Sequence, residues 1–211
     1  MRKIITVSIR LNSDFSGEQN ALISSLPFGE SEKSRLNSIK NPSHKAESLA
    51  ALVALNDMAQ DSSEDLTVSR TDNSKPYFKS SALQFSLSHS GRLSVAALCE
   101  RPVGIDVELL DKSRNNEKLI GRFFSEEEKE ILYSSADSSL SFYSIWTKKE
   151  ALTKISGDGL SGIKEKNSIS CFSHQYLLRL QTETYVMSVC TSAPDSITIN
   201  NAYKELTVYE L

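Results

Sequence analysis

The stretch QFSLSHSGRLSVAALCERPVGIDVELL, residues 84–110, decides the fold because it holds three strand-like runs separated by two turn signals. QFSLS (84–88) and RLSVAALCE (92–100) are joined by HSG, which is typical of a β-hairpin. The turn signal ERP separates the hairpin from a third run, PVGIDVELL (102–110). The stretch therefore predicts an antiparallel hairpin that leads into a third strand.

The segments before this stretch predict one strand followed by helices. Apolar residues alternate from Ile5 to Leu11, which indicates a half-buried strand. SEKSRLNSIK (31–40) and SHKAESLAALVALNDMAQ (43–60) predict two helices separated by Asn41 and Pro42, with Ser43 as the N-cap of the second. A polar, turn-rich region follows, in which LTVS (66–69) predicts a short strand.

Two further helices are expected after the stretch. In FFSEEEKEIL (123–132), Ser125 followed by Glu128 is the pattern of a capping box, with Phe124 at the staple position. FYSIWTKKEALTKI (142–155) predicts the next helix, and SGDG after it is a typical C-terminal stop.

The C-terminal part predicts short strands, so the order strand, helices, strands occurs twice. The runs are SISCF (168–172), YLLRLQT (176–182), TYVMSVCT (184–191) and SITIN (196–200). We therefore expect an α+β fold of two similar α+β halves, residues 1–101 and 102–211, with mostly antiparallel sheets flanked by helices.

Composition limits the classes of function. The 211 residues include 39% hydrophobic residues, enough for a packed core, and 24 basic against 27 acidic residues give a net charge of -3. This balance gives no general attraction to nucleic acid or to an anionic membrane. No apolar run approaches the ~20 residues of a membrane helix. Cys99, Cys171 and Cys190 lack metal-ligand spacing, and we expect reduced, buried cysteines in a cytoplasmic protein.

The third run of the opening stretch carries two acidic residues on one face. Because side chains alternate along a strand, Gly104, Asp106 and Glu108 share the face opposite Ile105 and its neighbours. The two carboxylates would lie about 7 Å apart by Cα, close enough to hold one Mg²⁺ together with phosphate oxygens. Gly104 would leave room for a ligand near the backbone. A solvated polar face on an edge strand is the alternative interpretation.

The helix expected at 142–155 offers a third acid and two cations. Glu150 could join the cation site or accept a proton, while Lys149 and Lys154 could neutralise phosphate oxygens. Phe142 and Trp146 would anchor the same helix in the core. The alternative is an ordinary stabilising Glu150–Lys154 pair at i, i+4.

SLSHSG (86–91) and the preceding SKP (74–76) form a third group of polar residues. Hydroxyl and backbone N–H donors at a turn suit a phosphate, and Lys75 beside a proline could add positive charge. A catalytic triad is not indicated, because no GxSxG elbow surrounds Ser88 or Ser90 and nothing pairs an acid with His89.

Together, SKP, SLSHSG, VGIDVE and WTKKEALTK resemble, in this order, the 4'-phosphopantetheinyl transferase superfamily, specifically its long, single-chain type. The match runs from about residue 66 to residue 160. The resemblance implies Mg²⁺-dependent transfer of the 4'-phosphopantetheine arm of coenzyme A to a serine of an apo acyl or peptidyl carrier protein. The second product would be adenosine 3',5'-bisphosphate.

The resemblance also assigns roles to residues. It implies that Asp106, Glu108 and Glu150 are the magnesium ligands, and that Glu150 takes the serine proton directly or through water. Asp106, Glu150 and Lys154 would be the catalytic residues. The coenzyme A contacts it implies are Lys154, Lys75, Ser88 and His89, with a basic residue near Lys45 for the 3'-phosphate.

The resemblance further implies that the two halves are related by a pseudo-twofold, with coenzyme A between them, and that the chain acts as a monomer. An acidic carrier would dock on residues 112–124, where basic residues alternate with Leu119, Ile120 and Phe123. The basic residues of this segment are Lys112, Arg114, Lys118 and Arg122. An ordinary mixed helix surface would show the same pattern.

Two other functions stay open at this point. One is a non-catalytic binder of coenzyme A or of a carrier protein, against which the intact acids and Lys154 argue. The other is a magnesium-dependent phosphohydrolase, which is disfavoured because two carboxylates on one strand without histidine ligands make a poor two-metal site. The identity of the natural carrier is also open.

Overall fold

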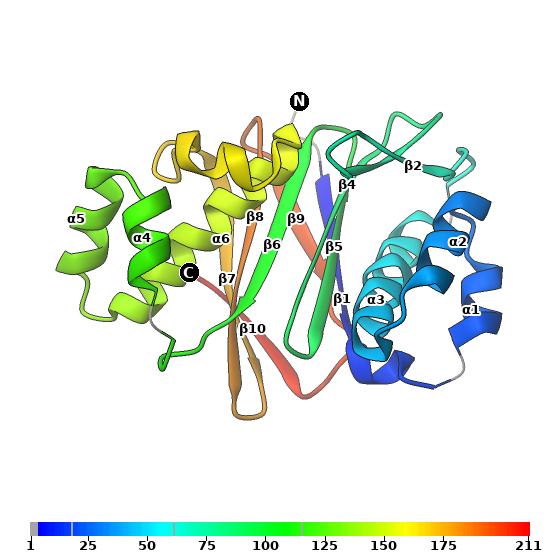
Figure 1. Cartoon of the computed structure of the whole chain (residues 1–211), viewed down its shortest axis with the longest axis horizontal. Helices are drawn as coiled ribbons and strands as arrows, with labels where there is room; N and C mark the ends of the chain where they lie inside the picture. Colours follow the sequence, from blue (N-terminus) through cyan, green and yellow to red (C-terminus); the bar gives the residue numbers. More distant parts are fainter. Residues whose placement is uncertain (1–3, 18, 61, 115) are drawn as a thin grey trace.

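The computed structural model of the chain describes residues 4–17, 19–60, 62–114 and 116–211. Two four-stranded sheets form the middle of the molecule, and one group of helices lies on the outer side of each sheet (Figure 1). Helices combined with mostly antiparallel strands confirm the predicted α+β class.

The first sheet has the strand order β4-β5-β1-β9. Its strands are β1 (Ile4–Leu11), β4 (Gln84–Ser90), β5 (Leu93–Cys99) and β9 (Ser196–Asn200). β4 and β5 form the predicted hairpin, and β5 pairs antiparallel with β1. β9 comes from the other end of the chain and pairs parallel with β1. The C-terminal part thus completes the sheet of the N-terminal part, and the division at residue 101 stays a prediction.

The second sheet has the order β10-β7-β8-β6. Its strands are β6 (Val103–Leu109), β7 (Phe172–Leu180), β8 (Glu183–Thr191) and β10 (Leu206–Glu210). β6 pairs with β8, so the third run of the opening stretch leaves the sheet of the hairpin and begins the other sheet. β2 (Val68–Arg70) and β3 (Pro76–Phe78) form a separate two-stranded sheet.

The predicted strand at 168–172 is wrong for its first four residues. The Asn167 side-chain oxygen accepts hydrogen bonds from the backbone N–H groups of Ile169 and Ser170, which turns the chain. β7 consequently begins only at Phe172.

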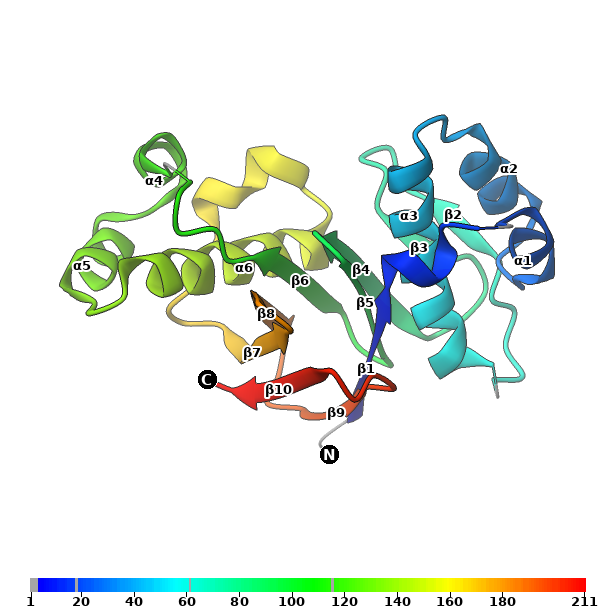
Figure 2. The same ribbon diagram turned by 90° about the horizontal axis from the view of Figure 1, so that it is seen from below.

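Three hydrophobic clusters hold these layers together. The first lies between the two sheets and takes alternate residues from their strands, including Val7, Val95, Ile105 and Met187. A second cluster packs the first sheet against the N-terminal helices, and a third packs the second sheet against the later helices. Figure 2 shows these helix groups on opposite sides of the paired sheets.

The helices are α1 (Gln19–Ser25), α2 (Glu30–Ser38), α3 (Pro42–Ala59), α4 (Glu117–Phe123), α5 (Glu126–Ser134) and α6 (Ser138–Ser156), with 3-10 turns η1 (Asn12–Phe15) and η2 (Gly159–Glu165). Local sequence signals explain the N-terminal ends of α3, α5 and α6 and the C-terminal end of α6. The N-cap of α3 is Asn41 and not Ser43, because Pro42 takes the first helical position and the Asn41 side chain accepts from Ser43 N and His44 N. The predicted capping box of α5 is confirmed. α6 ends at Gly157, whose φ is +78°.

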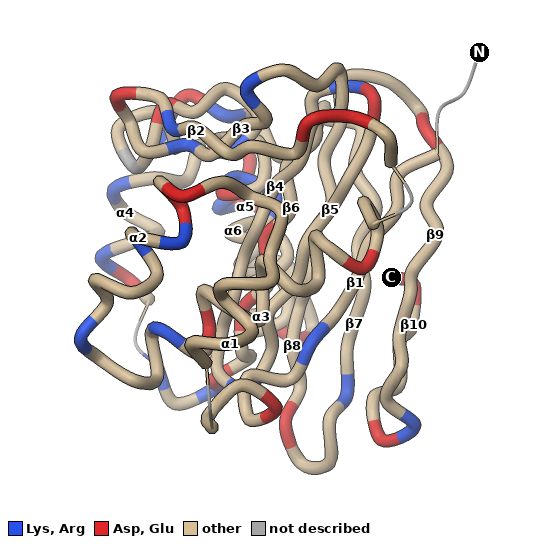
Figure 3. Tube along the Cα trace, turned by 90° about the vertical axis from the view of Figure 1, so that its right-hand side faces the viewer, with Lys and Arg blue, Asp and Glu red and all other residues tan. Residues whose placement is uncertain are grey.

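Three further observations concern the classes of function discussed above. Within the described ranges, no helix is long and apolar enough to cross a membrane. Basic and acidic residues are interspersed along the trace (Figure 3). Cys99 and Cys190 are buried and Cys171 is partly buried, and all three are free thiols.

Candidate active site

A cavity of about 530 Å³ is lined by residues of the N-terminal elements α2, α3, β2 and β4 and of the later elements β6, α6 and η2. β4 and the loop before β3 contribute Ser88, His89 and Lys75. β6 contributes Asp106 and Glu108, and α6 contributes Glu150 and Lys154. Seven of the nine site residues expected from the sequence therefore line one cavity.

Gly104 brings α6 and β6 together. A Cβ atom at this position would overlap the backbone carbonyl of Ala151 and lie 3.0 Å from the Ile155 side chain. The expectation that Gly104 leaves room for a ligand is therefore wrong, because the backbone of α6 fills this space. This close approach puts Glu150 and Lys154 of α6 beside the carboxylates of β6.

Lys154 is bound directly to Asp106. Its ammonium donates to Asp106 Oδ1 at 2.7 Å, to Ser88 Oγ at 2.8 Å and to the Ile105 carbonyl at 3.0 Å. Ser88 Oγ in turn donates to Asp106 Oδ1 at 2.8 Å. The alternative of a mere Glu150–Lys154 surface pair does not describe this lysine, because it reaches across to a strand 48 residues earlier.

The acids of the cavity carry more negative charge than Lys154 balances. Burial, followed by the neighbouring Asp106, raises the pKa of Glu150 to about 7, although Lys154 opposes the shift. Burial and Asp106 also raise the pKa of Glu108, against hydrogen bonding from Ser90. Both carboxyls are therefore easier to protonate than usual, as expected for acids that share a site.

A divalent cation fits the chemistry of this site. Asp106 Oδ2 is buried and, among the described residues, has no hydrogen-bond partner. An oxygen in this state is suited to a hard cation, and so are two nearby carboxylates that repel each other. However, no three acidic, histidine or cysteine side chains in the described ranges are arranged closely enough to form a ready metal-binding group. The three expected ligands share the cavity without forming a closed ligand set.

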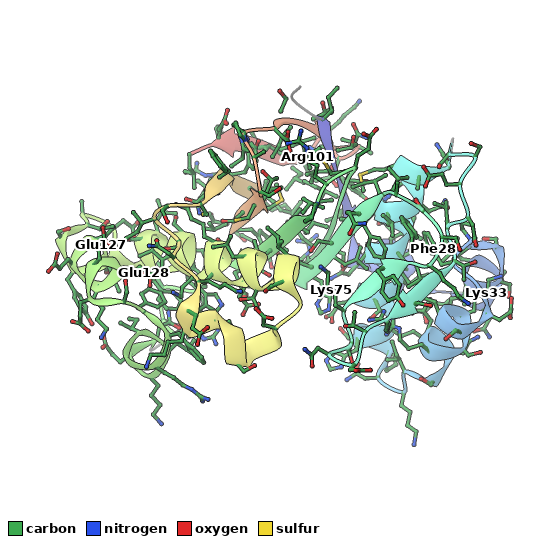
Figure 4. All side chains as sticks on the ribbon, turned by 90° about the horizontal axis from the view of Figure 1, so that it is seen from above. Phe28, Lys33, Lys75, Arg101, Glu127 and Glu128 are labelled. Carbon is green, nitrogen blue, oxygen red and sulfur yellow. The ribbon has the colours of Figure 1, made fainter. Side chains whose placement is uncertain are left out.

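Lys75 and His89 both line the cavity. Figure 4 shows Lys75 between the end of α6 and the N-terminal half, and its ammonium donates to the Ile155 carbonyl at 2.6 Å. Burial lowers the pKa of Lys75, with a smaller opposing effect of Asp158. Burial also lowers the pKa of His89, although Glu47, 3.5 Å from its Nδ1, acts in the opposite direction.

Lys149 does not reach the cavity, and its assignment to coenzyme A is a correction. Its side chain is 1% exposed, and Nζ lies 2.9 Å and 3.1 Å from the two carboxylate oxygens of Glu128. Nζ also donates to the Lys166 carbonyl at 2.6 Å. Because neighbouring residues of a helix point about 100° apart, Lys149 faces α5 while Glu150 faces the cavity.

Lys45 also lies outside the residues that line the cavity. Its ammonium contacts Asn37 Oδ1 at 3.4 Å. Ser48, about one helical turn after Lys45 in α3, does line the cavity. Two arginines that the sequence did not single out stand in the cavity wall instead, Arg35 and Arg70.

The two arginines are held by one buried carboxylate. Glu32, whose side chain is 4% exposed, accepts from Arg35 at 2.8 Å and from Arg70 at 2.7 Å. Burial opposes ionisation of Glu32, but hydrogen bonds from Arg70 and Arg35 outweigh it and lower its pKa. Two guanidinium groups against one carboxylate leave one positive charge at this end of the cavity. The Glu32–Arg35 spacing of three is visible in the sequence, whereas the contact with Arg70 spans 38 residues.

The aromatic anchor of α6 is present. Phe142 and Trp146 are 3% and 6% exposed, and their rings stack 6.2 Å apart. Trp146 also contacts Phe123 of α4. The early turns of α6 are thus packed in the third cluster while its later turns reach the cavity.

The segment 112–124 is only partly a surface, and its residue 115 lies outside the described part of the chain. Ile120 and Phe123 are buried in the third cluster, so they do not form the expected apolar part of a docking surface. The basic residues of the segment are exposed, and Lys112 pairs with Asp137 at 3.0 Å. Exposed apolar side chains lie on α5 instead, at Ile131 (44%) and Tyr133 (61%).

The part of the chain that carries these residues is similar in sequence to known proteins. A model of the 4'-phosphopantetheinyl transferase superfamily matches residues 102–195, which contain the three acids and Lys154. The chain is 41% identical over 91 residues to the 4'-phosphopantetheinyl transferase HetI of Nostoc sp., covering 42% of this chain and 38% of HetI. It is 30% identical over 141 residues to a 4'-phosphopantetheinyl transferase of Bacillus subtilis, covering 57% of this chain and 61% of that protein.

These two matches span less than two thirds of the relatives' length. A third covers more: the 4'-phosphopantetheinyl transferase AcpT of Salmonella typhimurium is 32% identical over 139 residues, which is 64% of this chain and 72% of AcpT. Given this coverage, and the position of the matched acids in one cavity, the chain belongs to the 4'-phosphopantetheinyl transferase superfamily.

Proposed function

We propose that this protein transfers the 4'-phosphopantetheine arm of coenzyme A to a serine hydroxyl of an apo carrier protein and releases adenosine 3',5'-bisphosphate. The observation that carries the proposal is the group of Asp106, Glu108, Glu150 and Lys154 on one cavity, within the part of the chain that the family model matches. HetI, AcpT and the Bacillus subtilis relative are each named as 4'-phosphopantetheinyl transferases.

In the proposed reaction, the carrier serine Oγ attacks the phosphorus next to the pantetheine arm. A new O–P bond forms, and the bond from that phosphorus to the bridging oxygen breaks, so the electron pair leaves with adenosine 3',5'-bisphosphate. The serine proton passes to Glu150, directly or through water. In the metal-free protein, burial and then Asp106 raise the pKa of Glu150 to about 7, and a bound Mg²⁺ would favour the ionised carboxylate that accepts the proton.

Lys154 would stabilise the charge that grows on the diphosphate oxygens. Its ammonium is already fixed by Asp106 and Ser88, so little reorganisation is needed during the reaction. Asp106, Glu108 and Glu150 would hold Mg²⁺, which supplies neutralisation of the diphosphate charge. The partnerless buried oxygen of Asp106 supports this role.

For the adenosine end of coenzyme A, we propose Arg35 and Arg70 as the phosphate contacts, in place of Lys45. Both line the cavity, where Glu32 holds the two guanidinium groups and the Ser74 carbonyl accepts from Arg70 Nη1 at 2.9 Å. Guanidinium groups bind phosphate oxygens in pairs, whereas a single ammonium acts as a point charge. Lys75, Ser88 and His89 complete the proposed coenzyme A contacts.

For the carrier, we propose docking on the exposed basic residues of 112–124 together with Ile131 and Tyr133 of α5. Tyr133 Oη lies 3.5 Å from Glu117 at the start of α4, so the two helices present one continuous surface. A partner with acidic residues around an apolar centre would match it. We also propose a monomeric, cytoplasmic enzyme. Light scattering during size-exclusion chromatography tests the first property.

The test is incubation of the purified protein with Mg²⁺, coenzyme A and an apo carrier protein, followed by the intact mass of the carrier. A carrier that gains one phosphopantetheine arm supports transfer. An unchanged carrier together with bound coenzyme A would indicate a non-catalytic binder. Breakdown of coenzyme A without labelling would indicate a phosphohydrolase.

A further inference from the structure

A row of three serine hydroxyls joins the two sheets beneath the cavity. Ser86, Ser88 and Ser90 of β4 lie two residues apart, so they share one face of the strand. Their Oγ atoms accept hydrogen bonds from the backbone N–H groups of Ile105 (3.1 Å), Val107 (3.5 Å) and Leu109 (3.0 Å).

These contacts replace a backbone ladder at this edge. β4 and β6 are edge strands of different sheets, and the outward N–H groups of β6 would otherwise be open. A hydroxyl can accept from such a group and still donate its own proton elsewhere. The destination of that proton differs among the three serines.

Two of the three hydroxyls donate to an acid of the cavity. Ser88 donates to Asp106 Oδ1 at 2.8 Å, and Ser90 donates to Glu108 Oε2 at 3.0 Å. Ser86 has no acid opposite it, because the matching position on β6 is Gly104. Ser86 and Ser90 therefore both accept a hydrogen bond from the backbone of β6, whereas only Ser90 also donates to Glu108. Ser86 can serve as the control for Ser90.

Ser90 is the contact that fixes Glu108. Asp106 is held by both Ser88 and Lys154, so loss of one contact leaves the other. Glu108 is partly buried, and Ser90 supplies its hydrogen bond. This bond engages Oε2 of a carboxylate that lines the cavity. The backbone next to the acid is fixed by the same hydroxyl through Leu109 N.

We propose that Ser90 is a positioning residue that orients the Glu108 carboxylate for a divalent cation. The inference rests on the proposed function, because it concerns the cation of that reaction. Groups that orient metal ligands through hydrogen bonds contribute strongly to metal affinity, although they do not touch the metal. Ser86 makes the same contact with the backbone of β6 but lies opposite Gly104 rather than an acid.

The test measures Mn²⁺ binding by electron paramagnetic resonance in the wild type, Ser90→Ala, Ser86→Ala and Ser90→Thr. Ser90→Ala should raise the dissociation constant for Mn²⁺ by about tenfold, while the dissociation constant of Ser86→Ala should stay close to that of the wild type. Ser90→Thr keeps the hydroxyl and should restore binding. Both alanine variants should lose similar thermal stability, because each loses one hydrogen bond between the sheets.

Equal Mn²⁺ affinity in Ser90→Ala and Ser86→Ala would overturn the inference, and so would a threonine variant as weak as Ser90→Ala. If Ser90→Ala does not fold, Ser90→Cys replaces it, since a thiol has a similar volume and is a weak donor. Labelling of the carrier by the wild type is scored separately. Weakened Mn²⁺ binding by Ser90→Ala in a protein that does not label carriers would refute the proposed function and leave the role of Ser90 intact.

Discussion

Replacement of Lys149 by methionine should destabilise the protein strongly and leave its affinity for coenzyme A nearly unchanged. Lys149 and Glu128 are each 1% exposed, and the ammonium contacts both carboxylate oxygens as well as the Lys166 carbonyl. Lys149→Met leaves the buried carboxylate without its counter-ion. Breaking a buried ion pair by removing one partner costs about 3–5 kcal/mol.

The expected change in melting temperature follows from that free energy. For a chain of this size, each kcal/mol lowers Tm by roughly 2–4 °C, so Lys149→Met should melt roughly 6–20 °C below the wild type. Circular dichroism at 222 nm measures the transition, and isothermal titration at low temperature measures coenzyme A binding. Lys129→Met is the matched control, because Lys129 pairs with Glu126, which is 87% exposed. A surface pair of this kind contributes about 0–1 kcal/mol.

A second variant separates charge from packing. In Glu128→Leu/Lys149→Met both charges are gone, and the double variant should recover part of the lost stability.

Hydrogen bonds from Ser168, Ser125 and Lys149 lower the pKa of Glu128 although burial opposes them. This acid therefore stabilises the wild type above its ordinary pKa of 4.5 and loses that effect as the pH falls through its lower folded value. A Lys149→Met variant as stable as Lys129→Met but unable to bind coenzyme A would refute the assignment of Lys149 to the core.

The remaining predictions concern the cavity. Glu150→Gln should abolish carrier labelling. In metal-free protein, a pKa raised to about 7 means that Glu150 favours the folded state fully below its ordinary 4.5 and loses this contribution as the pH rises through 7, so the glutamine variant should remove that part of the pH dependence of Tm. A glutamine variant with normal labelling would contradict the first expectation. Arg70→Gln should raise KM for coenzyme A by roughly 10- to 150-fold with a smaller change in kcat, because a hydrogen bond to a charged phosphate contributes about 1.5–3 kcal/mol. An unchanged KM would argue against this contact. Gly104→Ala should unfold the protein or displace α6, since its Cβ would overlap the Ala151 carbonyl, whereas Gly121→Ala has open space and should fold normally in a thermal melt. A fully stable Gly104→Ala variant would show that α6 does not lie against β6 as described.

Local signals in the sequence were enough to predict the main elements and the acidic face of β6. The alternation in 84–110, the capping box at Ser125 and the glycine stop at Gly157 act over a few residues, so they are readable without a fold. The α3 cap was misassigned by two residues because a proline after Asn41 fixes the first helical position.

Features that depend on distant contacts could not be predicted in this way. Lys149 and Glu150 are adjacent and equally polar, and only the packing of α6 against α5 decides that one is buried and the other faces the cavity. The contact between Arg70 and Glu32 joins segments 38 residues apart. β9 finds β1 across almost the whole chain, and no periodicity within either strand specifies that pairing.

We propose above all that this cavity catalyses transfer of the phosphopantetheine arm rather than cleaving or merely holding coenzyme A. The most direct measurement compares, in one reaction with Mg²⁺, the amount of adenosine 3',5'-bisphosphate released with the amount of carrier that gains the arm. Transfer predicts equal amounts of the two products with the wild type and neither product with Glu150→Gln. Release of the bisphosphate without a matching mass gain on the carrier would contradict it.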